Sequence, residues 1–213
     1  MSFAAEFEAA IPEPQTILGL RLLPLSLGRY QILKRFDCSF VADQDREISL
    51  EDVTGELFFA LLVCGLPVAE FEFLLDHPRQ FQKEARRFGK QANKIIKSTK
   101  GFNVLQVVHQ FREWLNRCSE PPWVILSYDD MKTTTMAHWA TSIEVTLRSK
   151  VNWDDHKIDE HPLAEALMHF FKYAEGEGMV RLYDPETYQS IQTEAKANGE
   201  ALAKMLKELN HGS

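Results

Sequence analysis

Three side chains that could bind a metal ion recur at intervals of four residues. His161, Glu165 and His169 would share one face of a helix, because residues four apart are neighbours on a helix surface. Two of them could then share a zinc ion, as a metal-dependent hydrolase would require, but zinc sites usually have three or four ligands. The sequence signals no further ligand, so we favour a solvated polar face and expect neither a metal nor a cofactor.

Other reactive side chains lack the neighbours that catalysis needs. Paired carboxylates stand at Asp129–Asp130 and Asp154–Asp155, but general acid–base chemistry needs one member buried, and both pairs suit loops or helix caps. The hydroxyls of Thr133–Thr135, near His138, have no glycine elbow beside them and are better explained as caps. Residues Lys97–Gly101 lack the glycine spacing of a phosphate-binding loop. We therefore expect no catalytic residue.

The most functional-looking feature is a run of cations from Arg79 to Lys97. Glu84 is the one acid inside it, and apolar residues recur at helical spacing beneath the charges. This pattern predicts a basic amphipathic helix, which can hold phosphates or an acidic protein surface. Pairing with the acidic C-terminal half and simple solvation are the alternatives. The candidate partner-binding residues are Arg79, Lys83, Arg86, Arg87, Lys90, Lys94 and Lys97.

The densest apolar stretch, from Ser49 to Leu75, predicts a helical hairpin. Apolar residues recur there at spacings of three and four, Gly65 suits the end of the first helix, and Pro67 suits the start of the second. Ser26 is a candidate cap for another helix. Further helices are expected at 27–36, 79–99, 103–118, 133–149, 162–176 and 184–209, extended segments at 16–23 and 123–128, and a polar loop at 152–160.

The composition is that of an ordinary soluble globular protein. The chain has 213 residues, of which 45% are hydrophobic and 26% charged. Its net charge of −7 argues against wholesale binding to nucleic acid or anionic lipid. The longest apolar run, 57–69, is shorter than the roughly 20 residues of a membrane span. Glu6 and Glu8 precede any basic residue, unlike the start of a secretory signal, so we expect a cytoplasmic protein.

These patterns predict a mostly α fold. We expect a compact multi-helix bundle with at most one short strand or hairpin. Residues 1–15 would form an N-terminal arm, residues 16–183 a helical domain with a lobe boundary near 119–122, and residues 184–213 a C-terminal helical extension. Three scattered cysteines are too few for a disulfide framework or a zinc site.

Several short motifs stand out along residues 18–183. They are Leu23-Pro24-Leu25-Ser26-Leu27-Gly28 with Phe40, the Phe58–Gly65 helix, Trp139, Trp153-Asp154-Asp155, Pro162-Leu163-x-x-Ala166 and Glu175-Gly176-Glu177-Gly178. Together they resemble small proteins encoded in the tail-gene regions of phages and prophages, which are taken to be tail assembly chaperones or tail-region proteins. The basic run and the residues after 183 have no counterpart in this resemblance.

The resemblance implies a non-enzymatic, chaperone-like tail assembly factor of the host cytoplasm. It would bind the tape-measure or tail tube protein during assembly, with an apolar groove for an amphipathic helix beside residues 79–97. The alternative is a nucleic-acid-binding helical protein that uses the same basic helix, and its binding would weaken steeply with salt. A homo-oligomer is left open, and no membrane partner is expected.

Overall fold

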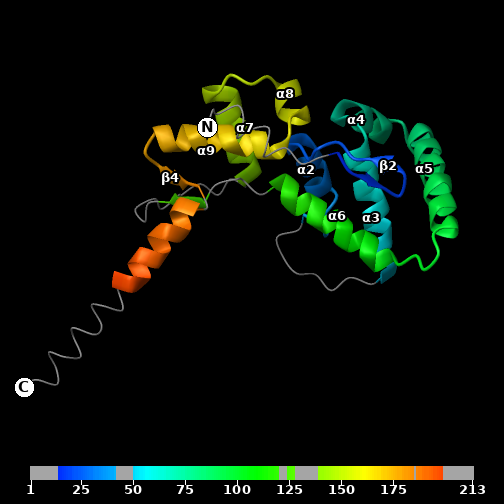
Figure 1. The fold of residues 1–213 in the computed structure, drawn as a ribbon. Coiled ribbons are helices and arrows are strands. Elements are labelled where there is room, and N and C mark those ends of the chain that lie inside the picture. The colour runs from blue at the N-terminus through cyan, green and yellow to red at the C-terminus, as the bar shows by residue number, and fades with distance from the viewer. Residues whose placement is uncertain (1–13, 42–49, 120–123, 128–138, 185, 199–213) are drawn as a thin grey trace, which may run out of the picture. The chain divides into compact units, whose positions relative to one another are not determined.

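The computed structural model describes residues 14–41, 50–119, 124–127, 139–184 and 186–198 (Figure 1). The chain divides into two compact units, Met1–Glu120 with Thr135–Phe170, and Pro121–Thr134 with Phe171–Ser213. The expected arm up to residue 13, the cap at Ser49, and the candidates Asp129, Asp130, Thr133–Thr135 and His138 lie outside the described residues.

The described residues are mostly helical, which confirms the expected fold class. In the first unit the helices are α2 (Leu27–Arg35), α3 (Leu50–Gly65), α4 (Val68–Asp76), α5 (Pro78–Ser98), α6 (Val104–Ser119), α7 (Trp139–Lys150) and α8 (Asp155–Glu160). Helix α9 (Leu163–Gly176) belongs to the first unit up to Phe170 and to the second from Phe171. Residues 186–198 of the second unit are also helical.

The described residues also form two short antiparallel strand pairs, one more than the single hairpin expected. In the first unit, β1 (Thr16–Ile17) pairs with β2 (Leu20–Arg21) through a tight turn at Leu18 and Gly19. In the second unit, β3 (Val124–Ser127) pairs with β4 (Val180–Tyr183). The sequence predicted extended structure near β3, where Val124, Ile125 and Leu126 form an apolar run, but missed β4, whose four residues Val180-Arg181-Leu182-Tyr183 contain no such run.

The core of the first unit is built on the predicted hairpin of α3 and α4. On α3, the side chains of Leu57, Leu61 and Cys64 are fully buried. Aromatic rings join the neighbouring helices: Phe71 of α4 lies 5.8 Å from Phe59 of α3 and 6.1 Å from Phe81 of α5, between ring centroids. Phe71 is fully buried and contributes roughly 1.5–3 kcal/mol through removal of its surface from water. The half-buried rings of Phe59 and Phe81 pack on it, which joins α5 to the core.

The polar loop expected at 152–160 is wrong in its second half, which forms α8. The Asp154 side chain accepts a hydrogen bond of 2.7 Å from the backbone N–H of Lys157 and so caps this helix. Ile158 supplies its one buried side chain. A six-residue helix with a single apolar anchor has no visible periodicity, which is why the sequence pattern indicated a loop.

Side-chain caps begin two other helical segments, and the cap at Ser26 was predicted from the sequence. The Ser26 hydroxyl accepts the backbone N–H of Arg29 at 3.2 Å, which confirms it as the cap of α2. Asp184 accepts the N–H of Thr187 at 2.8 Å at the start of the helical residues 186–198. Among the described helices, none combines the length and the apolar character that crossing a bilayer would require.

Candidate functional site

The seven cations predicted to bind a partner lie along one exposed side of α5. We call them the basic stripe: Arg79, Lys83, Arg86, Arg87, Lys90, Lys94 and Lys97, all exposed. Phe88 and Ala92, on the opposite side of the helix, are buried. At 1.5 Å per residue the stripe is about 27 Å long. The structure therefore brings all seven predicted residues together on a single surface.

Among the described residues, acidic side chains neutralise little of the positive charge of the basic stripe. Arg87 forms an ion pair of 3.5 Å with Glu84, one turn earlier on the same helix. Within the described ranges, the other six cations make no ion pair. Like charges three and four residues apart on a helix repel one another. The stripe thus stabilises the helix little and leaves a concentrated positive field at the surface.

The first half of the basic stripe surrounds a surface hollow of about 520 Å³. Its described lining consists of basic side chains and one amide, which can donate hydrogen bonds but offer no carboxylate for acid–base chemistry. Such a site suits recognition of anionic groups. The lining residues are Arg79, Gln82, Lys83, Arg86, Arg87 and Lys90.

Helix α5 is held firmly behind this surface. The side-chain amide of Gln91 donates a hydrogen bond of 2.7 Å to the carbonyl oxygen of Gly19, at the β1–β2 turn (Figure 1). Gly19 has a φ of +78°, and a Cβ there would lie 2.6 Å from Gln91 Nε2 and 2.7 Å from Ile95 Cδ1. Glycine adopts this φ without strain, and its carbonyl links the turn to α5 without covering the basic side of the helix.

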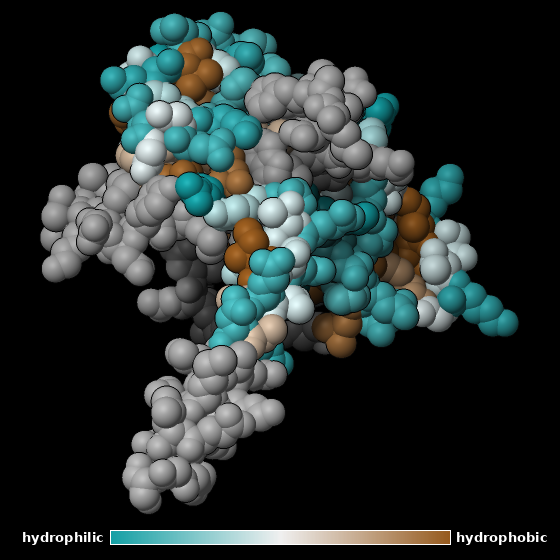
Figure 2. Space-filling view, turned by 60° about the vertical axis from the view of Figure 1, so that its left-hand side comes forward, coloured by the Kyte–Doolittle hydropathy of each residue, from teal (hydrophilic) through white to brown (hydrophobic). Residues whose placement is uncertain are grey.

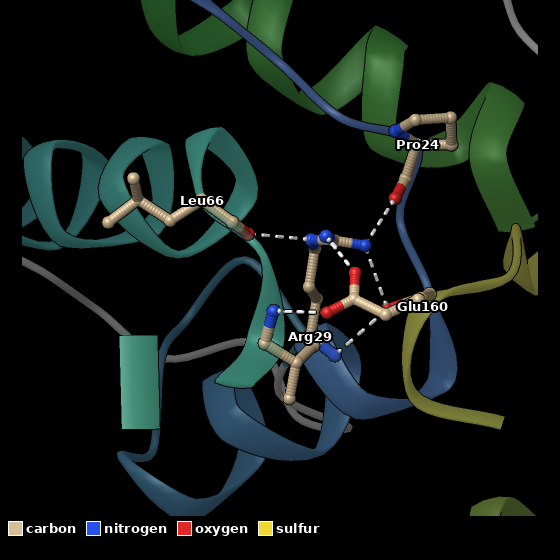
Figure 3. A network of polar contacts seen from close by, with 6 residues as sticks. Pro24, Arg29, Leu66 and Glu160 are labelled. Atoms are coloured by element: carbon tan, nitrogen blue, oxygen red, sulfur yellow. Dashed lines mark hydrogen bonds and ion pairs between the residues drawn. The ribbon is translucent and has the colours of Figure 1, made fainter. Parts of the chain in front are cut away.

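A second polar centre is buried, and sequence reasoning missed it. Arg29 of α2 is 1% exposed, and its Nη2 atom lies 2.6 Å from a carboxylate oxygen of Glu160, at the end of α8 (Figure 3). The guanidinium also donates to the carbonyl oxygens of Leu66 and Pro24, at 3.2 and 3.3 Å, and to the Ser26 hydroxyl at 3.1 Å. We call this network the Arg29 clamp.

The Arg29 clamp fixes the base of α4. The second carboxylate oxygen of Glu160 accepts the N–H of Val68, the first residue of α4, at 2.6 Å. One acid thus neutralises Arg29 and caps α4. Because α4 leads into α5 after the single residue His77, the clamp determines where the basic stripe begins. The only sequence signal was an arginine within an apolar stretch, Leu27-Gly28-Arg29-Tyr30.

The three side chains considered as metal ligands do not share one helix, as their spacing predicted, because His161 is the extended residue after α8 and α9 begins at Leu163. His161 Nδ1 lies 3.0 Å from Glu165 Oε2, while the rings of His161 and His169 lie 5.3 and 5.0 Å from that of buried Trp153. Burial lowers the pKa of His169, against the opposing charge of Glu165. Over the described ranges, no group of three or more His, Cys, Asp or Glu side chains is arranged to hold a metal.

Other residues considered for chemistry serve the fold. Asp155 pairs with Arg148 at 2.6 Å, beside the capping Asp154. The hydroxyls of Ser98 and Thr99 both bond to the carbonyl oxygen of Ile95, at 2.9 Å, and so close the end of α5. These carboxylates and hydroxyls are therefore engaged in capping and ion pairing.

The three cysteines are buried thiols without nucleophilic character. Burial raises the pKa of Cys38 and of Cys118 to about 11, and raises that of Cys64 further. A thiol attacks as the thiolate, so none of them is activated near neutral pH.

Among the described residues, the basic stripe is therefore the surface with the clearest capacity for recognition.

Comparison with known proteins gives no match: no family model, curated protein or solved structure is similar to this chain. The functional proposal therefore depends on the site and on the sequence motifs. The face drawn in Figure 2 shows hydrophobic residues in separate patches among hydrophilic ones.

Proposed function

We propose that the protein is a non-enzymatic phage tail assembly factor that binds an acidic partner through the basic stripe of α5. The observation that carries the proposal is the stripe itself, where six exposed cations make no ion pair with any described residue. Clustered like charges cost stability, so a folding role does not account for them. The assignment to tail assembly is supported by the motifs that resemble tail-region proteins.

The partner would be the tape-measure protein or the tail tube protein, met in the host cytoplasm. An amphipathic helix with an acidic edge fits a straight stripe about 27 Å long. Charge complementarity of this kind raises the association rate and fixes orientation. It also makes the binding reversible by salt, as release of the partner during assembly requires.

Co-expression with the neighbouring tail proteins tests this proposal. We expect the wild-type chain to co-purify with one of them and the R86E/R87E/K90E variant to lose it. A control variant, R21E/R117E/K150E, carries the same charge change on exposed residues of other elements and should retain the partner. If the stripe variant retains the partner as well as the control does, while both unfold at the wild-type temperature, the proposal is wrong.

A second candidate function is nucleic-acid binding, favoured by the cationic lining of the hollow on α5. Phosphate contacts by those side chains would give an affinity that falls steeply with salt. A gel-retardation assay of duplex DNA and single-stranded RNA at two ionic strengths separates the two candidates. Retardation that disappears in R86E/R87E/K90E and at high salt would favour this function, and the absence of retardation at low salt would exclude it.

A further inference from the structure

The helix that precedes the basic stripe carries the opposite charge. The exposed side of α4 holds Glu70, Glu72 and Asp76 around Phe73, whose side chain is 48% exposed. None of these three acids forms an ion pair with a described residue. We call this surface the acidic face. Its centre is aromatic and its rim is negative.

The negative charge continues from α4 onto α8. Asp159 of α8 has a raised pKa, first because of partial burial and then because of the nearby charge of Glu72 on α4, followed by Asp155, Glu160 and Glu144. The acidic face is therefore part of a wider negative region of the first unit. Such a region favours a positively charged partner.

The acidic face and the basic stripe lie on consecutive helices of the chain. Helix α4 ends at Asp76, and α5 begins at Pro78. In two copies related by a two-fold axis near this junction, the acidic face of each would meet the first half of the basic stripe of the other. Such a contact is isologous and closed, so every charge pair forms twice.

We propose that the acidic face of α4 docks onto the basic stripe of a second copy of this chain, forming a closed dimer. The occupant is chosen by charge complementarity, because each copy carries both halves of the contact. Within the described residues, the acids of the acidic face and all cations of the stripe except Arg87 make no ion pair. Phe73 adds an aromatic contact, because its ring stacks on His77 on one side, at 4.0 Å between centroids, and an arginine of the partner copy can cover the other.

The dimer goes beyond the proposed function and sets a condition on it. An α4 of nine residues is about 13 Å long, and so covers only part of the stripe, around Arg79 to Lys90. Lys94 and Lys97 stay open to a tail protein. A tail protein that uses the whole stripe therefore competes with self-association.

Sedimentation velocity of the purified full-length chain tests the dimer. We expect the mass of a dimer at about 0.1 M salt, where the Debye length is about 10 Å, and a shift toward monomer at about 1 M, where it is about 3 Å. The variants R86E/R87E/K90E and E70K/E72K/D76K should each be monomeric at both salt concentrations. An equimolar mixture of the two variants should restore the dimer mass at low salt, because each supplies the charge that the other lacks.

Three results would overturn the dimer. The wild-type chain could sediment as a monomer at low salt, either variant could keep the wild-type dimer mass, or the mixture could stay monomeric. Circular dichroism of each variant checks that it is folded. No tail protein is present in this experiment, so its failure leaves the proposed function standing, and a failed co-purification leaves the dimer standing.

Discussion

Two groups of arginines in the first unit have opposite environments. Arg29 is 1% exposed, and carbonyl, hydroxyl and carboxylate oxygens surround its guanidinium. Arg79, Arg86 and Arg87 lie on the exposed side of α5, with one ion pair of 3.5 Å among them. A buried charge is tolerated only when it is fully partnered, so the first environment belongs to folding. The second has no folding role that its contacts explain, and we propose recognition as its role.

The largest loss of stability is expected when the buried cation, Arg29, is replaced. R29M should lower the free energy of unfolding by about 3–5 kcal/mol, because the Glu160 carboxylate and the backbone carbonyls lose their donor while shape is roughly kept. Urea denaturation measures the change. R86M is the matched control and should stay within about 0.5 kcal/mol of wild type. Equal stability of R29M and R86M would contradict the contrast between the two environments.

Removing the negative charge of Glu160 from the Arg29 clamp should lower the free energy of unfolding by a smaller amount. E160Q keeps an oxygen that can accept the N–H of Val68 but leaves Arg29 without a counter-charge, and should cost about 2 kcal/mol. Because both residues belong to one network, R29M/E160Q should destabilise by less than the sum of the single variants. Additive losses in the same urea titrations would mean that the two side chains act independently.

His169, beside Trp153, predicts a pH dependence of the free energy of unfolding. Burial lowers the pKa of His169 in the folded chain below its unfolded value of about 6.5. The unfolded chain then binds this proton more readily, so stability should fall as the pH drops from 7 through 6.5 toward the folded pKa. H169Q should flatten this slope in thermal unfolding between pH 7 and pH 5. An unchanged slope would assign it to other groups.

The smallest change in stability is expected at Asp159 of α8, in the wider negative region beside the acidic face. The pKa of Asp159 is raised in the folded chain, so its contribution to stability is present at low pH and is lost as the pH rises through the folded pKa. At pH 7 the charged carboxylate therefore destabilises the fold. D159N should raise the stability by a few tenths of a kcal/mol at pH 7, as charge changes of partly exposed groups do, and should have no such benefit near pH 3. A destabilised D159N at pH 7 would show that the carboxylate makes a favourable contact.

Elements with a strong period were predictable from the sequence. The hairpin of α3 and α4, the cap at Ser26 and the two-sided character of α5 all follow from residues within one or two turns of each other. All seven residues of the basic stripe were identified in this way. Their pattern depends only on α5 being a helix, and the alignment of one helix face needs no knowledge of the tertiary fold.

The elements that were missed depend on distant or very short stretches. The Arg29–Glu160 pair joins residues 131 positions apart. The spacing of residues within one helix cannot predict a contact between such distant parts of the chain. Helix α8 has six residues, too few for a periodic pattern, and β4 lacks the apolar run that indicated β3. His161, Glu165 and His169 had ligand-like spacing, yet His161 lies before α9, at the end of α8. The rings of both histidines lie beside that of Trp153.

Titration calorimetry of the purified chain with the tape-measure or tail tube protein that co-purifies with it is the most direct test of the central claim. We expect the R86E/R87E/K90E variant to bind at least about tenfold more weakly than wild type, with a loss that shrinks as salt screens the stripe. Equal dissociation constants for the folded variant and the wild-type chain would contradict the assignment of α5 as the partner-binding surface.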